Sequence, residues 1–293
     1  MGAKSTTKRR WGAEQRLEFI ESRLYWDGVF SRSDLIERFG VSAAQASADL
    51  AAYKELASAN LYYDGSEKRF IANESFSPVL FQPNADRYLL QLRAIGDQVI
   101  SPMDAAVGVL PLSDAMPIPH RRIDPQVLRR LLAVVRQNRG LSVCYHSMNE
   151  KYPLPLWRVI TPHAFAFDGL RWHVRAYCEF EQRFKDFILS RILELGPDHE
   201  PGKSFDEDQD WNAFFDVILV PNPKLSETQQ QTVANDYEMT GGELHMQVRC
   251  ALLYYFNKRL RLDIAEQVDN PRETPIVVAN KAEFRKALAT AGA

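Results

Sequence analysis

The hydrophobic periodicity of this chain changes near Gly140, and that change constrains the fold more than any other feature. Before this glycine, apolar residues recur every three or four positions, as with Leu17, Ile20 and Leu24, a spacing that is typical of amphipathic helices. After it, apolar and polar residues alternate over several short segments, which is typical of antiparallel strands. The sequence therefore predicts a multidomain α+β protein, mainly helical at first and then built around a small β-barrel or half-barrel.

A pair of short helices joined by a tight turn follows the first helix, which is predicted over residues 13–26. Ser33 can cap a helix over residues 34–39 that ends at a glycine, and Ser42 can cap a second helix that runs to about Ala57. This spacing is that of a helix-turn-helix, whose second helix offers its N-terminal residues to the major groove of DNA.

Two short strands, 61–63 and 69–72, follow these helices and are joined through Asp64-Gly65, a preferred hairpin turn. Three helices and a basic hairpin predict a winged helix. Helix-turn-helix spacing also occurs in ordinary helical bundles, so the DNA-binding interpretation depends on the wing and on the basic N-terminal arm as well; the arm could equally be a disordered tail. The residues predicted to contact DNA are Ser42, Gln45, Ser47 and Lys54 on the second helix, Lys68 and Arg69 at the wing, and Arg9 and Arg10 on the arm, while Asp49 should face away or pair with Lys54.

The rest of the chain divides into a connector, a barrel and an extension, after a winged helix-turn-helix domain over residues 1–75. The connector, 76–139, holds a linker and helices over 84–99 and 124–138; the barrel, 140–200, holds strands over 141–147, 157–167, 171–178 and 183–195.

The extension, 211–293, has the element order βαββαβ of a ferredoxin-like unit. Its predicted elements are a strand over 216–221, a helix over 226–237, a strand pair around Gly241-Gly242, a helix over 251–260, a strand over 275–280, and a closing helix capped by the side chain of Asn280.

Composition excludes several classes of protein. The 293 residues are 45% hydrophobic and 25% charged, with a net charge of −2, which is typical of a globular chain. Cys144, Cys178 and Cys250 lie far apart and lack the spacing of a zinc or disulfide framework, so reduced thiols and a cytoplasmic location are expected. No stretch is apolar enough for a signal peptide or a membrane span.

Enzymatic interpretations find little support. Gly202-Lys203-Ser204 resembles the end of a phosphate-binding loop, but five residues rather than four separate it from Gly196. Cys144 with His146 lacks the accompanying ligands or base of a metal or thiol site. We expect no catalysis, no cofactor and no metal.

Two segments of the barrel, GLRWHVRAYC and RFKDFILSRI, resemble the signature of WYL-domain proteins. Of the name-giving Trp-Tyr-Leu, Trp172 is retained, and His173 and Val174 replace the other two residues. This form, together with the segment FGVSAAQASADLAAY at 39–53, is similar to a subgroup of WYL repressors that accompany bacterial phage-defence operons of the BREX and CBASS kind. The resemblance covers nearly the whole chain.

The resemblance implies a winged helix-turn-helix, a helical connector, an Sm-like WYL barrel and a C-terminal extension that supplies dimer contacts. It further implies a homodimeric repressor that binds an inverted-repeat operator in double-stranded DNA and responds to a nucleotide or nucleic-acid effector at the WYL domain. The alternative is an accessory nucleic-acid-binding sensor without operator specificity.

Alternation along residues 172–178 places the even-numbered residues in the core and the odd-numbered residues on the other face. The resemblance implies that polar and aromatic residues there converge with others on a basic pocket for an anion. The alternative is that the cations merely pair with Asp186, Glu179 or Glu181 on a solvated sheet. The predicted ligand-binding residues are Tyr145, Ser147, His163, His173, Arg175, Tyr177, Lys185 and Arg191.

Overall fold

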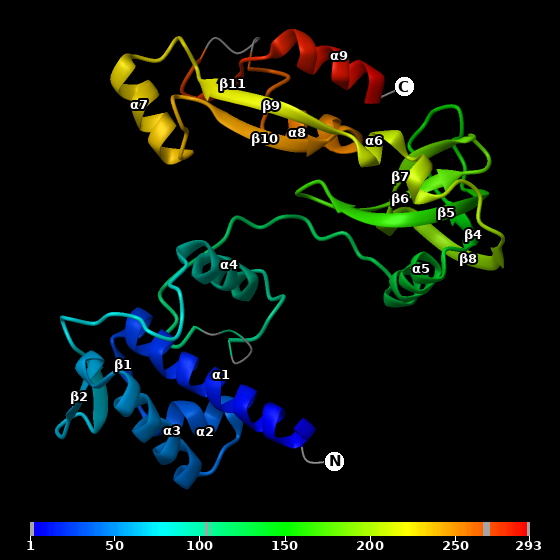
Figure 1. Cartoon of the computed structure of the whole chain (residues 1–293). Helices are drawn as coiled ribbons and strands as arrows, with labels where there is room; N and C mark the ends of the chain where they lie inside the picture. Colours follow the sequence, from blue (N-terminus) through cyan, green and yellow to red (C-terminus); the bar gives the residue numbers. More distant parts are fainter. Residues whose placement is uncertain (1–2, 103–104, 106, 266–269, 292–293) are drawn as a thin grey trace. The chain divides into compact units, whose positions relative to one another are not determined.

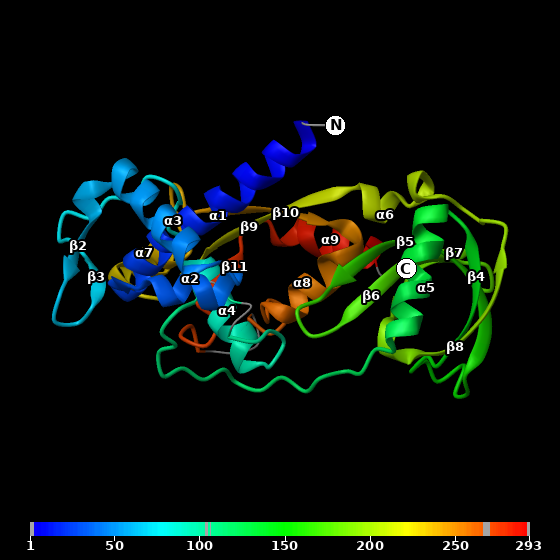
Figure 2. The same cartoon turned by 90° about the horizontal axis from the view of Figure 1, so that it is seen from below.

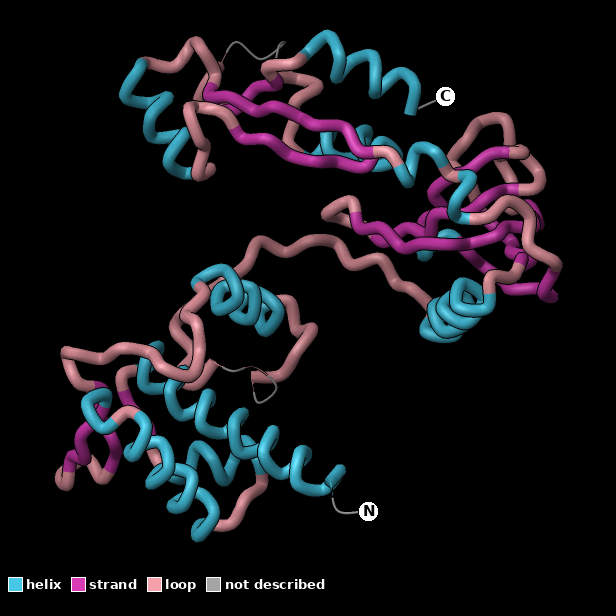
Figure 3. The backbone as a smooth tube through the Cα atoms, in the orientation of Figure 1, coloured by secondary structure: helices cyan, strands magenta, loops and turns pink. Residues whose placement is uncertain are grey.

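A computed structural model describes residues 3–102, 105, 107–265 and 270–291, with side chains described from residue 12 to residue 290 within these ranges. The chain forms two compact units, Met1–Ile118 and Pro119–Ala293. The first is mainly helical and the second holds most of the strands (Figures 1 and 3).

The N-terminal unit is a winged helix, as predicted. Its core is formed by Ile20, Leu24, Leu35 and Tyr53, all fully buried. Its three short strands form one sheet in the order β1-β3-β2. The elements are α1 (Ala3–Asp27), β1 (Val29–Phe30), α2 (Arg32–Phe39), α3 (Ala43–Leu56), β2 (Leu61–Asp64), β3 (Arg69–Ala72) and α4 (Ala85–Gly96).

The start of α2 differs from the prediction, because Ser31 rather than Ser33 is the N-cap. The backbone N–H of Ser31 donates to Asp34 Oδ2 at 2.6 Å, in a capping box that begins the helix at Arg32. The predicted cap of α3 is confirmed: Ser42 Oγ accepts from the backbone N–H of Gln45 at 3.1 Å.

The segment after the wing, predicted as a linker, is tied to α1 by a buried carboxylate. Glu21 is fully buried and accepts hydrogen bonds from the backbone N–H groups of Val79, Leu80 and Phe81 at 3.0, 2.6 and 3.0 Å. The hydroxyl of Tyr53 donates to the same carboxylate at 3.1 Å. Through these four bonds one side chain fixes the chain that leads into α4.

The described residues between Asp97 and Ile123 form no helix or strand. Ala105 and Val107 are buried, and the backbone N–H of Val109 donates to Asp27 at 3.3 Å, so this stretch packs on the winged helix up to that point. The remaining fourteen residues, 110–123, we call the tether; they include Leu112 and Met116 with exposed side chains.

The WYL part of the second unit is a five-stranded antiparallel sheet in the order β7-β6-β5-β4-β8. Leu131 and Val134 of α5 pack into its core, and Figure 2 shows this helix lying along the sheet. As predicted, α5 begins at Pro125 after Asp124, whose side chain caps it. The elements are α5 (Pro125–Gln137), β4 (Gly140–Tyr145), β5 (Leu156–Phe167), β6 (Trp172–Cys178), β7 (Arg183–Ile188) and β8 (Ile192–His199).

The strand predicted over 183–195 is in fact two strands. A 3₁₀ turn at Leu189–Arg191 separates β7, at one edge of the sheet, from β8, which pairs with β4 at the opposite edge. Curvature of the sheet brings these edges close enough for three residues to join them, and a half-barrel results.

The C-terminal part contains a three-stranded antiparallel sheet in the order β10-β9-β11. The predicted strand before Gly241 is reduced to a single bridge between Thr240 and Glu243, because two glycines with φ of 64° and 85° reverse the chain at once. Otherwise the order agrees with the expected ferredoxin-like unit. The elements are α6 (Gln209–Asn212), β9 (Phe214–Pro221), α7 (Glu227–Asp236), β10 (Leu244–Arg249), α8 (Leu253–Arg259), β11 (Ile276–Val278) and α9 (Lys281–Ala291).

The expected capping role of Asn280 is wrong. Its side-chain amide donates to the carbonyl of Asp216 at 2.8 Å and accepts from the N–H of Ile218 at 3.1 Å. Asn280 therefore links the start of α9 to β9.

Candidate DNA-binding and effector sites

The N-terminal end of α3 is held in place by Asp49, which is buried. Gln45 Nε2 donates to Asp49 Oδ1 at 2.9 Å, which orients the exposed amide of Gln45. Arg16 of α1 grips the same carboxylate through Nε at 2.6 Å and Nη2 at 3.1 Å. Of the two expectations for Asp49, pairing with Lys54 is wrong, because the bidentate partner is Arg16; Asp49 instead faces α1.

A groove of about 430 Å³ lies between α3 and the wing. Arg32 Nη1 donates to Ser47 Oγ at 3.2 Å, and Lys54 Nζ lies 4.4 Å from the centroid of the Phe70 ring. Three cations on the rim of one groove are the arrangement that phosphate binding needs. The predicted residues that line it are Ser47, Lys54 and Lys68; the residues that sequence reasoning missed are Ser31, Arg32, Leu50, Ala51, Tyr63 and Phe70.

Three of the predicted DNA contacts with described side chains, Ser42, Gln45 and Arg69, do not line this groove. Arg69 forms an ion pair with Glu67 within the wing. The side chains of Arg9 and Arg10 lie outside the described residues. Nothing in the sequence indicated a role for Arg32 in DNA binding, because the helix that begins at this residue was predicted to begin at residue 34.

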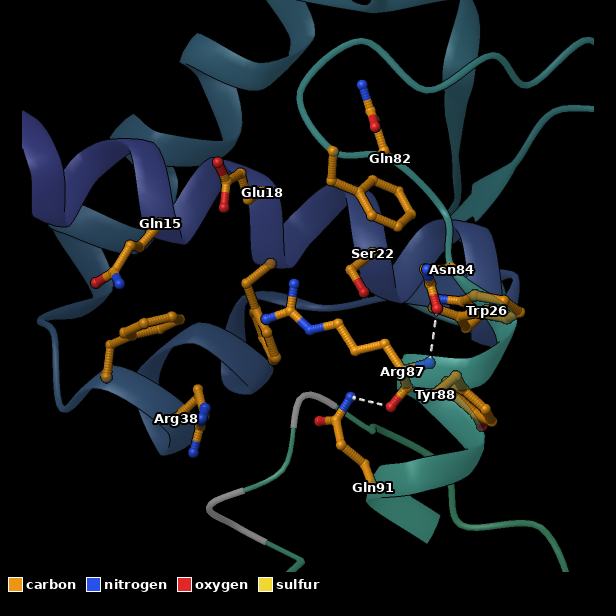
Figure 4. Close-up of a pocket in the computed structure, with 13 residues that line it drawn as sticks. Gln15, Glu18, Ser22, Trp26, Arg38, Gln82, Asn84, Arg87, Tyr88 and Gln91 are labelled. Atoms are coloured by element: carbon orange, nitrogen blue, oxygen red, sulfur yellow. Dashed lines mark hydrogen bonds between the residues drawn. The ribbon is translucent and has the colours of Figure 1, made fainter. Parts of the chain in front are cut away.

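A second cavity in the N-terminal unit, of about 420 Å³, lies between α1, α2 and α4 (Figure 4). Trp26 stacks on Tyr88 at 4.6 Å between ring centroids, and the side chain of Arg87 extends from α4 across the cavity. These aromatic contacts attach α4 to the winged helix.

The third cavity, of about 300 Å³, surrounds the end of the edge strand β7, and we call it the WYL cavity. It is formed by the barrel and by α8 of the C-terminal part. The predicted residues that line it are Tyr145, Ser147, His173, Lys185 and Arg191; those that sequence reasoning missed are Met148, Asn149, Arg158, Arg171, Asp186, Phe187, Ile188, Tyr254 and Tyr255.

Two of the cations of the WYL cavity share one carboxylate. Lys185 Nζ lies 2.6 Å from each oxygen of Glu181, and the buried Arg158 donates to the same group. Burial opposes ionisation of Glu181, but the hydrogen bonds from Lys185 and Arg158 outweigh it and lower its pKa to about 2. The pairing of Lys185 with Glu181, which the sequence left as an alternative, is thus present in the structure.

Arg175, by contrast, does not line the WYL cavity. Its Nε and Nη2 donate to Asp208 at 2.8 and 3.0 Å, and its Nη1 donates to Asp186 at 3.5 Å. His163 Nε2 donates to Asp208 at 3.0 Å. Burial opposes ionisation of Asp208, but the hydrogen bonds from His163 and Arg175 lower its pKa to about 2.

The predicted single pocket is therefore corrected. Tyr177 donates to Gln182 at 3.0 Å, and it lies with Arg175 and His163 outside the WYL cavity. The register pairs Arg175 with Asp186 and Ala176 with Lys185, so Lys185 projects from the face opposite Arg175.

No group of three or more His, Cys, Asp or Glu side chains among the described residues is placed to hold a metal ion, and the three cysteines are free thiols. Within the same residues, no helix combines the length and apolar character that a membrane crossing requires.

Comparison with protein families agrees with this organisation. Residues 12–94 match the BrxR transcriptional regulator winged helix-turn-helix domain, 126–197 match the WYL domain, and 214–284 match the BrxR transcriptional regulator C-terminal dimerization domain. These matches define a winged-helix transcriptional regulator with a WYL domain and a dimerization domain.

Comparison with individual proteins identifies the family more specifically than the domain matches do. The chain is 37% identical over 289 residues to the DNA-binding transcriptional repressor CapW of Stenotrophomonas maltophilia, covering 98% of this chain and 95% of the relative. CapW of Escherichia coli (strain KTE188) is 37% identical over 94% of this chain and 91% of its own, and CapW of Pseudomonas aeruginosa is 37% identical over 94% and 92%. The chain therefore belongs to the CapW family of DNA-binding transcriptional repressors.

Proposed function

We propose that this repressor binds an inverted-repeat operator as a homodimer and that an anionic nucleotide or nucleic-acid effector in the WYL cavity changes its affinity for DNA. The groove between α3 and the wing, with Arg32, Lys54 and Lys68 on its rim, is the observation that carries the DNA-binding assignment. The resemblance to repressors of phage-defence operons supports an operon of that kind as the target.

The effector assignment is supported by the charge of the WYL cavity. Four cations line it, Arg158, Arg171, Lys185 and Arg191, against one acid among the lining residues, Asp186. Three of these cations are paired with Glu181 or Asp168, and Arg191 has no ion pair among the described residues. For such an effector to control repression, it must bind the DNA-competent and DNA-incompetent states with different affinities.

The deciding experiment is a footprint on duplex DNA from upstream of the gene, compared with a scrambled duplex over a salt series. We expect a protected inverted repeat that is preferred by a factor of about a thousand or more. Equal and steeply salt-dependent binding to both duplexes would instead establish the accessory sensor without operator specificity.

Gln45→Ala is expected to weaken binding to the operator by about 1–3 kcal/mol and to change binding to the scrambled duplex little, because an oriented amide reads adenine in the major groove. Anisotropy titrations with both duplexes measure this difference. Gln137→Ala, at an exposed position of α5, is the control. An equal loss on both duplexes would contradict base readout by Gln45.

Lys68→Asn is expected to lower the slope of log K against log salt by about 0.9 for each protomer bound, on both duplexes alike, because one phosphate contact is lost. Asparagine is chosen because Lys68 has a φ of 53°, which asparagine tolerates better than alanine. Lys286→Asn on α9 serves as the charge-matched control, and a slope that stays at the wild-type value in Lys68→Asn would remove this residue from the interface.

A further inference from the structure

The WYL cavity is not made by the WYL barrel alone. Tyr254 and Tyr255, at the start of α8, line it, and both lie within the segment that matches the dimerization domain. An occupant of this cavity would therefore touch the barrel and the dimerization domain at the same time.

Tyr255 is anchored to the barrel. Its hydroxyl donates to Asp186 Oδ2 at 3.2 Å, and its ring centroid lies 4.8 Å from that of His173. Burial is the main cause that raises the pKa of Asp186, with Arg175 acting in the opposite direction. Asp186 lies on β7 and binds both Arg175 and Tyr255. The position of α8 therefore depends on β7, the strand that also lines the cavity.

Tyr254 stands beside this anchor but is itself free to meet a ligand. The residue is 55% exposed, and its ring lies 5.5 Å from the ring of Tyr255, with the two ring planes at 80°. The hydroxyl of Tyr254 makes no hydrogen bond among the described residues. Lys258 Nζ lies 5.9 Å from the centroid of the Tyr254 ring. An exposed aromatic ring at a cationic cavity is the arrangement that stacks on a nucleobase.

Arg191 supplies a further cation to the lining of the cavity. Arg158 and Lys185 share Glu181, and Arg171 pairs with Asp168 at 2.8 Å. The half-buried guanidinium of Arg191 has no ion pair among the described residues. Arg191 is therefore the cation whose charge an incoming phosphate would neutralise without breaking an existing bridge.

We propose that Tyr254 stacks on the base of a nucleotide unit of the effector while Arg191 binds its phosphate, so that the effector joins the WYL barrel to the dimerization domain. This inference rests on the proposed effector site and deepens it. The nucleotide unit is either a free nucleotide or the end of a single strand, since the recognition chemistry is the same for both.

The test uses the full chain and three probes: 5′-phosphorylated pentathymidylate, the corresponding abasic pentamer and thymidine 5′-monophosphate. Wild-type protein is expected to bind the pentathymidylate about 5- to 150-fold more tightly than the abasic pentamer, the range for stacking of one base on an aromatic side chain. Tyr254→Ala should remove this preference without weakening binding of the abasic pentamer, and Tyr254→Phe should keep it. Arg191→Ala should weaken both pentamers alike.

Tyr237→Ala, at another exposed tyrosine of the C-terminal part, is the matched control, and unchanged thermal unfolding shows that each variant is folded. Equal affinity for the monophosphate and the pentathymidylate identifies a free nucleotide as the ligand, and a tenfold preference for the pentamer identifies a strand end; both support the inference. A base preference that survives in Tyr254→Ala overturns the stacking role and leaves the effector site standing. If wild-type protein binds none of the probes, the effector site and this inference both fail.

Discussion

Replacing Glu21 by alanine is expected to lower the free energy of unfolding of the N-terminal unit by about 3–5 kcal/mol, since each buried polar group left without a partner costs about 1–3 kcal/mol. The substitution removes the acceptor for the N–H groups of Val79, Leu80 and Phe81 and for the hydroxyl of Tyr53. Urea denaturation followed by far-UV circular dichroism measures the loss.

Two further variants separate this effect from the loss of a charge. Glu21→Gln keeps one acceptor oxygen but presents an NH₂ group to backbone donors, so it should fall between wild type and Glu21→Ala. Glu18→Ala, one turn earlier on the exposed face of α1, should change stability by less than about 0.5 kcal/mol. If Glu21→Ala is as stable as Glu18→Ala, the carboxylate does not hold the segment after the wing.

Asp208→Asn is expected to destabilise the C-terminal unit by about 3 kcal/mol at neutral pH, because it leaves the buried guanidinium of Arg175 without its bidentate partner. The effect depends on pH. Asp208 has a pKa of about 2, below its ordinary value of 3.8, so the stabilisation is complete above about pH 4 and is lost as the pH falls toward 2.

The difference in unfolding free energy between wild type and Asp208→Asn should therefore shrink by about 2 kcal/mol between pH 5 and pH 2, at about 1.4 kcal/mol per pKa unit. Chemical denaturation at a series of pH values measures this. Asp206→Asn, an exposed neighbour, is the control. A difference that stays constant across this range would show that the carboxylate of Asp208 is not the ionised partner of Arg175.

Much of the architecture could be predicted from local patterns. The caps at Ser42 and Asp124 and the hairpin at Asp64-Gly65 are signals carried by a few adjacent residues, and the structure contains all three. The polar side chains that were assigned wrongly, such as Asn280, bind partners far away in the sequence. Capping patterns do not show whether a distant strand competes for the same side chain.

The WYL cavity was harder to predict, for a related reason. Alternation along β6 separated the two faces, except that Trp172, expected in the core, is 48% exposed. The rest of both faces is buried, with His173, Arg175 and Tyr177 almost as inaccessible as the core residues. The second face is covered by Asp208 and Tyr255, which follow the end of β6 by 30 residues or more. The register between β6 and β7 decides the side of the sheet from which Lys185 projects. This register is set by the turn between the two strands, and it cannot be read from the residue pattern of either strand alone.

The tether, residues 110–123, sets a length scale for the operator. A chain of fourteen residues spans at most about 50 Å when fully extended. Whatever the arrangement of the two units, each winged helix remains within that distance of the start of α5 in its own chain. One turn of B-DNA is about 34 Å, so one fully extended tether spans about one and a half turns. For a dimer that binds an operator with both winged helices, the greatest distance between half-sites would be set by two tether lengths together with the distance between the two α5 helices.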